Sequence, residues 1–129
     1  MSRNTKKAIQ VFNQGGIVIF PTDTAFGIGC RIDNREAIEK LYTIRKRPVT
    51  QAASILVANE QMAKEYVKSI PNDVKNRLIE PFWPGGLTII LESKIDTIPK
   101  LVRGGGKTIG VRMPDHADLL SLISKVGVP

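Results

Sequence analysis

Apolar residues recur along this chain at two spacings, and each spacing predicts one kind of element. Spacings of three and four residues predict amphipathic helices over residues 5–13, 33–45, 59–67, 72–80 and 115–127. Short apolar runs predict strands over residues 16–20, 54–57, 87–91 and 108–112. Because helices and strands do not alternate strictly, we expect an α+β (α/β-like) fold in which helices flank a twisted, mixed β-sheet.

The helix ends carry their own signals. Asp33, followed three residues later by Glu36, resembles a capping box, and Asn59 is a capping residue for the third helix. We expect the last helix to start at Asp115. The only histidine, His116, lies at this start, where a solvated or capping role is favoured over a catalytic one.

Length and composition indicate one globular domain. The chain has 129 residues, of which 42% are hydrophobic and 24% charged. It contains no apolar run of about 18 residues, as a membrane span would need, and no secretory signal, so the expected location is the cytoplasm, without membrane contact. Cys30 is the only cysteine, which excludes an internal disulfide and a cysteine-built metal site.

The charge predicts an anionic partner. The formal net charge is +7 and the isoelectric point is about 9.8. Nucleotides, tRNA, other RNA and acidic protein surfaces all remain possible partners. The densest basic cluster consists of Lys40, Arg45, Lys46 and Arg47. Aromatic residues make up only 5% of the chain, so the sequence shows no obvious set of stacking platforms for single-stranded nucleic acid.

A polar loop follows the first predicted strand. Residues 17–20 are apolar without interruption, which predicts a strand covered on both faces. Pro21 should end the strand, so residues 22–24 would lie beyond its carboxyl end, where α/β folds bind ligands. Gly27 and Gly29 would allow a ligand or another strand to approach. The alternative is a capped turn in which Asp23 and Thr24 bond their own backbone.

Arginines at two further places are candidates for ligand binding. Arg45 and Arg47 would project to one side if the helix has ended there, as two guanidiniums that hold phosphate must; a solvated helix end is the alternative. Arg112 ends a predicted buried strand and needs either Asp23, Asp115 or an anionic ligand as its partner.

A run of glycines at positions 104–106 precedes Lys107 and Thr108. It does not match a phosphate-binding P-loop, because Leu101 stands where that motif needs glycine and a strand follows. A hairpin tip is favoured, with an anion-binding nest of amides as the alternative.

Four segments together resemble the YrdC-like family of L-threonylcarbamoyladenylate synthases, from about Lys7 to Pro129. They are Phe20-Pro21-Thr22-Asp23-Thr24 with Phe26-Gly27-Ile28-Gly29, then Arg45-Lys46-Arg47-Pro48, Pro84-Gly85-Gly86-Leu87-Thr88 and Val111-Arg112-Met113-Pro114.

The resemblance implies a concave basic face on which ATP, L-threonine and bicarbonate meet. Threonine and bicarbonate give a carbamate that attacks the α-phosphate of ATP, and the resulting threonylcarbamoyl-AMP passes to partner transferase proteins that modify adenosine 37 of tRNA (t6A). Magnesium would accompany the ATP. The site would position its substrates, with no catalytic side chain and no metal held by the protein. By position, the threonine-binding residues would be Thr22, Thr24, Phe26 and Arg112, and the ATP-binding residues Arg45, Arg47, Gln51 and Thr108.

The chain departs from the family pattern at several positions. Phe26 replaces a usual tyrosine, Arg45 replaces a lysine, and Ala52 with Ala53 replaces a common Pro-Leu pair. The sequence also stops at Pro129, before the family's Ser-x-Asn segment. We therefore expect residues 1–129 to be a YrdC-like domain truncated at its C-terminus, with an open sheet edge and weak activity on its own.

Two other functions remain open. One is an RNA-binding module that holds tRNA or double-stranded RNA without catalysis, for which the basic charge is the argument. The other is a YrdC-like domain of a carbamoyltransferase, which the short length disfavours.

Overall fold

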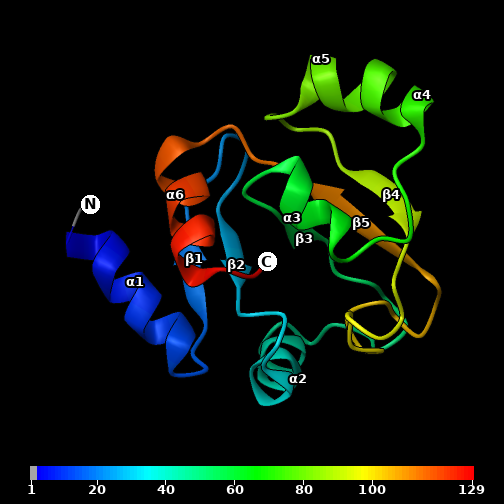
Figure 1. Cartoon of the computed structure of the whole chain (residues 1–129). Helices are drawn as coiled ribbons and strands as arrows, with labels where there is room; N and C mark the ends of the chain where they lie inside the picture. The colour runs from blue at the N-terminus through cyan, green and yellow to red at the C-terminus, as the bar shows by residue number, and fades with distance from the viewer. Residues whose placement is uncertain (1–2) are drawn as a thin grey trace.

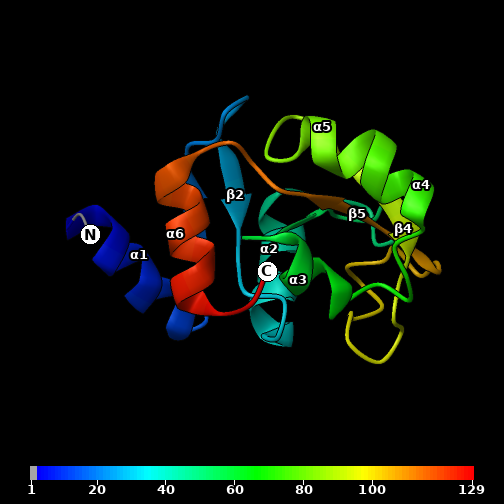
Figure 2. The ribbon, with the colours of Figure 1, turned by 45° about the horizontal axis from the view of Figure 1, so that its top comes forward.

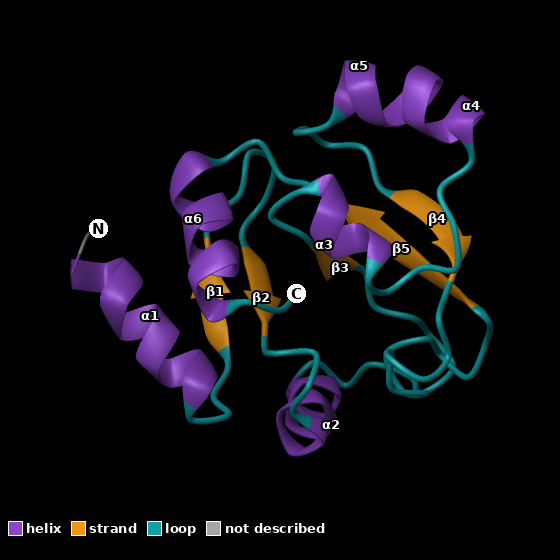
Figure 3. Ribbon diagram, in the orientation of Figure 1, coloured by secondary structure: helices purple, strands orange, loops and turns teal. Residues whose placement is uncertain are grey.

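The computed structural model describes residues 3–129 as two small sheets surrounded by helices (Figures 1 and 3). In chain order the elements are α1 (Arg3–Asn13), β1 (Val18–Phe20), β2 (Gly27–Gly29), α2 (Arg35–Ile44), β3 (Ile55–Leu56), α3 (Glu60–Lys64), α4 (Asn72–Val74), the π-helix η1 (Lys75–Ile79), α5 (Glu80–Phe82), β4 (Ile89–Glu92), β5 (Thr108–Arg112) and α6 (Ala117–Val126).

The two sheets differ in strand direction. β1 and β2 form an antiparallel pair, whereas β3, β5 and β4 form a three-stranded sheet in that order. In the larger sheet β3 runs parallel to β5, with Leu56 opposite Arg112, and β4 runs antiparallel to β5, with Ile89 opposite Val111. The predicted mixed α+β fold is therefore confirmed, with the strands divided between two open sheets.

The prediction that the first strand is covered on both faces is wrong. Ile19 is 69% exposed, so the face of β1 to which it belongs is open to solvent. Phe20, on the other face, lies against Gly27 and Gly29 of β2. A Cβ atom added to Gly27 would come within 2.6 Å of the Phe20 ring. The two glycines thus admit a strand and its aromatic side chain, as one of the sequence hypotheses proposed.

Two hydrophobic clusters form the interior. The larger one packs both helices and loops against the three-stranded sheet and includes Val57, Ile98, Ile109 and Val111, each at most 1% exposed. The smaller one joins α1 to α6 through Phe12 and the leucine and isoleucine side chains of α6. Figure 2 shows α1 and α6 side by side, next to β2 and apart from β4 and β5.

Two helix starts differ from the predicted capping residues. Asn34, not Asp33, caps α2, because its side chain accepts a hydrogen bond from the Ala37 amide, whereas Asp33 pairs with Arg31. His116, not Asp115, caps α6 through its Nδ1 atom, which accepts from the Leu119 amide at 3.2 Å. The capping role of His116 and of Asn59 is therefore confirmed.

Two helix ends also differ. α3 stops at Lys64, short of the predicted residue 67, because Val67 forms a bridge with Ser93 beside β4. The helical run that starts at Asn72 continues through Pro81 to Phe82, because Pro81 occupies the first turn of α5, where a missing N–H is tolerated. Within residues 3–129, no helix is long and apolar enough to cross a bilayer.

Candidate active site

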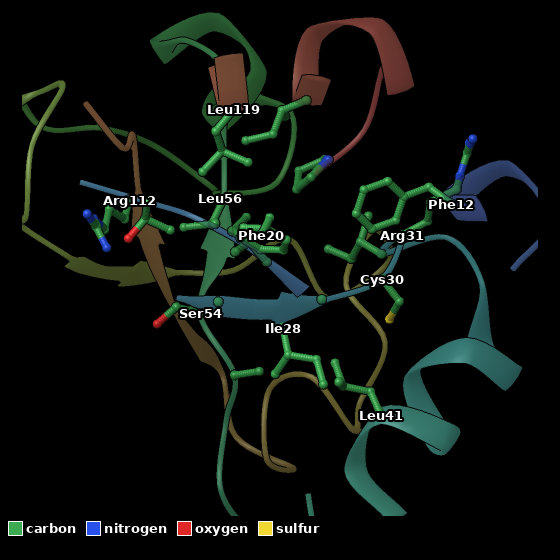
Figure 4. A pocket seen from close by; sticks show the side chains of 18 of the residues that line it. Phe12, Phe20, Ile28, Cys30, Arg31, Leu41, Ser54, Leu56, Arg112 and Leu119 are labelled. Atoms are coloured by element: carbon green, nitrogen blue, oxygen red, sulfur yellow. The ribbon is translucent and has the colours of Figure 1, made fainter. Parts of the chain in front are cut away.

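A cavity of about 440 Å³ lies between the two hydrophobic clusters. Its walls come from the β1–β2 loop, β2, the C-terminal end of α2, β3, the end of β5 and α6 (Figure 4). The apolar side chains Phe20, Leu56 and Leu119 line one part of it. Its polar wall is basic: Arg31, Arg45, Arg47 and Arg112 line the cavity, and no aspartate or glutamate of the described residues does. This charge distribution suits an anionic ligand.

Arg112 is held at all three of its nitrogen atoms. Its Nε donates to the carbonyl of Gly85 at 2.9 Å, and its Nη1 lies 3.1 Å from Thr24 Oγ1. Its Nη2 forms an ion pair with Asp23. The side chains of Arg112 and Asp23 are 13% and 17% exposed, so this pair is largely shielded from water. Of the two carboxylates that the sequence offered as partners, Asp23 is the one that pairs with Arg112.

The loop that carries Thr22 and Thr24 is held by local hydrogen bonds. Thr22 Oγ1 donates to the Ala25 carbonyl at 2.5 Å and accepts from the Thr24 amide at 3.1 Å. A capped turn is therefore present, but the Thr22 side chain forms it, and not Asp23 and Thr24 as the alternative hypothesis stated. The turn leaves Asp23 and Thr24 directed toward Arg112, so the loop is both a local turn and one wall of the cavity.

Arg45 and Arg47 line the cavity from the end of α2. Arg45 is the C-cap residue of the helix, and the next residue, Lys46, has a positive φ of 51°, so the helix has ended before Arg47. Both arginines line the cavity, as the phosphate-binding hypothesis requires. Arg47 is also anchored: its Nη2 donates to the Ala52 carbonyl at 2.5 Å, and its guanidinium lies 5.9 Å from the centre of the Tyr42 ring.

Of the eight predicted binding residues, six line the cavity: Thr22, Thr24, Phe26, Arg45, Arg47 and Arg112. Phe26 is 77% exposed at its edge. Gln51 and Thr108 are not among the lining residues. Gln51 contributes a backbone carbonyl that accepts from Tyr42, and Thr108 begins β5, at the opposite end of the strand from Arg112. The ligand roles of all eight remain predictions.

The glycine run is a turn and not an anion nest. The amides of Gly104, Gly105 and Gly106 donate to the carbonyls of Leu101, Lys100 and Arg103. These amides are therefore already used within the chain, which favours the turn over the nest.

Sequence reasoning did not single out several residues of the cavity, among them Arg31, Ser54 and Tyr42. Ser54 lines it beside Gly110, whose missing side chain leaves room for the Ser54 hydroxyl: an added Cβ would lie 2.9 Å from Ser54 Oγ. Tyr42 also lines it, and its hydroxyl donates to the carbonyls of Gln51 and Leu101, each at 2.9 Å. Tyr42 falls within the predicted helix over residues 33–45, and the only signal for a further role was its place five residues before Arg47.

Cys30 lines the cavity as a half-buried thiol. Burial raises its pKa from 9.0 to about 11. The thiol is therefore protonated at neutral pH, which suits a packing role. Next to it, Arg31 donates to both oxygens of the Asp33 carboxylate, and this hydrogen bonding lowers the pKa of Asp33.

Comparison with known proteins gives a consistent result. The sequence model of the Sua5/YciO/YrdC family, described as telomere recombination, matches residues 10–129. A threonylcarbamoyl-AMP synthase of Bacillus subtilis is 33% identical over 123 residues, which are 95% of this chain and 35% of that protein. The synthase of Photobacterium profundum is 31% identical over 127 residues, 98% of this chain and 68% of that protein.

A solved structure resembles the fold closely. The crystal structure of Pyrococcus abyssi Sua5 complexed with L-threonine matches with a TM-score of 0.91 and 30% identity, and covers 97% of this chain and 36% of that one. The chain thus spans about a third of the length of the Bacillus and Pyrococcus relatives and about two thirds of the Photobacterium relative. On the evidence of the matching family model and the fold, the chain belongs to the Sua5/YciO/YrdC family.

Proposed function

We propose that this chain carries a threonylcarbamoyl-AMP synthase site. In the proposed reaction, the amine of L-threonine and bicarbonate combine to a carbamate with loss of water. A carbamate oxygen then attacks the α-phosphorus of ATP, the bond to the β-phosphate oxygen breaks, and pyrophosphate leaves. The relatives that bear this name support the reaction, and the Pyrococcus protein complexed with L-threonine supports the substrate.

One observation carries the proposal: residues far apart in the sequence meet at one basic cavity. Arg112 contacts Thr24, 88 residues away, and both line the cavity with Arg45 and Arg47. Two groups of arginines on separate walls give places for two anionic groups, a carboxylate and a phosphate chain. A cavity of about 440 Å³ that a small amino acid and part of a nucleotide share would bring their reacting ends together.

The proposed chemistry fits side chains that bind and neutralise charge. In this proposal Arg112 and Thr24 hold the threonine carboxylate end, with Thr22 and Phe26 beside it. Arg45 and Arg47 neutralise charge on the phosphates, as a displacement at phosphorus requires. No protein nucleophile is needed, because the carbamate itself attacks.

Magnesium would enter with ATP. The described residues include no group of three or more histidine, cysteine, aspartate or glutamate side chains that could hold a metal ion. Phosphate oxygens and water would therefore supply the Mg²⁺ ligands in this proposal, where the ion supplies additional neutralisation of phosphate charge.

The product would serve tRNA modification. Threonylcarbamoyl-AMP is a reactive mixed anhydride, and the proposed acceptor is adenosine 37 of tRNA, reached through partner transferase proteins of the t6A pathway. A location in the cytoplasm, where tRNA and these partners would be present, is part of the same proposal.

The test combines binding and turnover. L-threonine and ATP should each bind by titration calorimetry, and pyrophosphate release should require both threonine and bicarbonate. Arg112→Gln should abolish threonine binding, whereas Arg77→Gln, which removes an exposed charge on η1, should not. Salt-sensitive tRNA binding without binding of ATP or threonine would contradict the proposal and favour the RNA-binding alternative.

A further inference from the structure

Lys46 has a backbone conformation that residues with a side chain rarely adopt. Its φ angle is 51°, and among the described residues it is the only residue other than glycine with a positive φ. In this left-handed region the Cβ atom crowds the following carbonyl oxygen, so glycine, or sometimes asparagine, is the usual residue. A lysine at such a position indicates that the surrounding structure imposes the conformation.

The end of α2 imposes it. The Lys46 amide donates to the Thr43 carbonyl at 3.1 Å, and the Arg47 amide donates to the Tyr42 carbonyl at 2.9 Å. These two hydrogen bonds are the pattern of a Schellman motif, in which a helix ends at a left-handed residue. Pro48 follows and cannot extend the helix, because it has no N–H. The chain therefore turns out of the helix at Lys46.

This turn determines where the two neighbouring arginines lie. Arg45, before the turn, has helical backbone angles, with φ −82° and ψ −3°. If the helix continued, the side chains of Arg45 and Arg47 would diverge by about 200° around its axis. Instead both line the cavity, and Arg47 Nη2 donates to the Ala52 carbonyl. The left-handed residue between them thus brings two guanidiniums to one cavity.

The side chain of Lys46 takes no part in this arrangement. It is exposed and does not line the cavity. Within residues 3–129 it forms no ion pair and no side-chain hydrogen bond. What Lys46 contributes to the cavity is therefore its backbone geometry, and a substitution can separate that geometry from the charge of the side chain.

We propose that Lys46 is a positioning residue for the phosphate side of the cavity. Its left-handed backbone, and not its charge, directs Arg45 and Arg47 together onto the phosphate groups of the nucleotide. This inference rests on the proposed function, because that function assigns the phosphates to these two arginines. It adds the reason why side chains on either side of a helix end can act on one ligand.

The test is a series of four substitutions at position 46, all of which remove the charge. Binding of ATP and of L-threonine is measured separately by titration calorimetry, in the absence of bicarbonate, so that no turnover takes place. Glycine and asparagine tolerate the left-handed conformation, whereas alanine disfavours it and the β-branched valine disfavours it most.

Lys46→Gly and Lys46→Asn should bind ATP within about twofold of the native chain. Lys46→Val should lose at least about tenfold in ATP affinity, the effect of one charge-assisted hydrogen bond, and Lys46→Ala should lie between. Threonine affinity should stay within about twofold in all four variants, because the proposed threonine contacts, Thr24 and Arg112, belong to other elements. If Lys46→Val does not fold, Lys46→Ala should still bind ATP at least about threefold more weakly than Lys46→Gly.

Lys125→Val is the matched control, because it makes the same change at an exposed lysine in the last turn of α6 and outside the cavity lining. It should leave the affinity for ATP unchanged. A role of the Lys46 charge predicts an equal loss in all four variants, and a role in stability alone predicts native ATP affinity in every variant that folds. Either result would overturn the inference while the proposed function stands. If the native chain binds no ATP, the proposed function fails, and the inference with it.

Discussion

At the scale of single residues, Arg47 combines two roles that a substitution can separate. Its guanidinium lines the cavity and also ties the end of α2 to the Ala52 carbonyl. We expect Arg47→Ala to weaken ATP binding by about 1.5–3 kcal/mol, because a phosphate loses a charge-assisted hydrogen bond, and to affect threonine binding much less. Titration calorimetry with each ligand measures both effects.

The control is Arg35→Ala, which removes an exposed charge from the first turn of α2 and does not line the cavity. The affinity of this variant for ATP should equal that of the native chain within experimental error. Unchanged ATP affinity in Arg47→Ala would remove Arg47 from the predicted phosphate site.

The Cys30 thiol gives a second test at this scale. With its pKa raised to about 11, the thiolate fraction at pH 8 is about a hundredfold lower than for a thiol at the ordinary value of 9.0. We expect a thiolate-selective reagent to label the native chain about a hundredfold more slowly than the chain unfolded in urea. Equal rates in both states would show that the thiol is exposed and ordinary.

The same shift has a defined effect on stability. A pKa that is higher in the folded state favours folding below the unfolded value, and that contribution is lost as the pH rises through the folded value. The free energy of unfolding should therefore decline as the pH rises from about 9 to about 11. Cys30→Ala should remove this part of the decline.

Residue types alone predicted much of the site. The sequence offered Asp23 as a partner of Arg112 because a buried arginine needs an anion, and the structure confirms the pair. The sequence could not show that Thr22 rather than Thr24 forms the local turn, because both hydroxyls can reach backbone groups at this spacing. Only the position of Arg112, fixed by β5, decides which threonine hydroxyl it contacts.

At the scale of elements, two glycines that both have a positive φ angle differ in their surroundings. Gly104 has φ +62°, and a Cβ there would lie 2.7 Å from backbone atoms of Thr50 and Ala52. Gly127, the C-cap of α6, has φ +87° and nothing within 4 Å of that position. A side chain is strained at both positions, but it collides with neighbours only at the first.

We therefore expect Gly104→Ala to lower the free energy of unfolding by about 2–4 kcal/mol, and Gly127→Ala by only about 1 kcal/mol. Denaturant titration measures the free energy of unfolding of both variants. Gly104→Ala combines backbone strain with a steric collision, whereas Gly127→Ala introduces backbone strain alone. Equal losses would mean that the loop containing Gly104 moves away from residues 50–52 without cost.

Element boundaries illustrate which signals are local. Asn59 and His116 were predictable as caps because a helix start depends on neighbouring residues. The early end of α3 was not, because it depends on the bridge between Val67 and Ser93, 26 residues apart. Strand β2 escaped prediction for a similar reason: Gly27-Ile28-Gly29 has little strand propensity and is extended through its pairing with β1.

At the scale of the whole molecule, the cavity lies where two separately packed clusters meet. The three-stranded sheet supplies Arg112, the C-cap of α2 supplies Arg45, and the β1–β2 loop supplies Thr24. Residue patterns predicted each of these elements, but no local pattern states that the strands divide into two sheets. That division depends on contacts between distant segments, such as those between α1 and α6.

The hydroxyl of Tyr42 has a consequence for the rates at which ligands associate and dissociate. The hydroxyl donates to the carbonyls of both Gln51 and Leu101, so these hydrogen bonds hold two loops against α2. Tyr42→Phe removes both hydrogen bonds and keeps the aromatic ring of a residue that is 4% exposed in the native chain. Arg47 still holds the segment at Ala52, so the equilibrium affinity for ATP should change little.

Association and dissociation should instead both become faster in Tyr42→Phe, because the loosened segment opens the cavity more often. Stopped-flow measurement of nucleotide binding separates the two rate constants. Faster rates with an unchanged ratio would identify the Tyr42 hydroxyl, which binds two loop carbonyls, as a control on how long the proposed site retains its nucleotide.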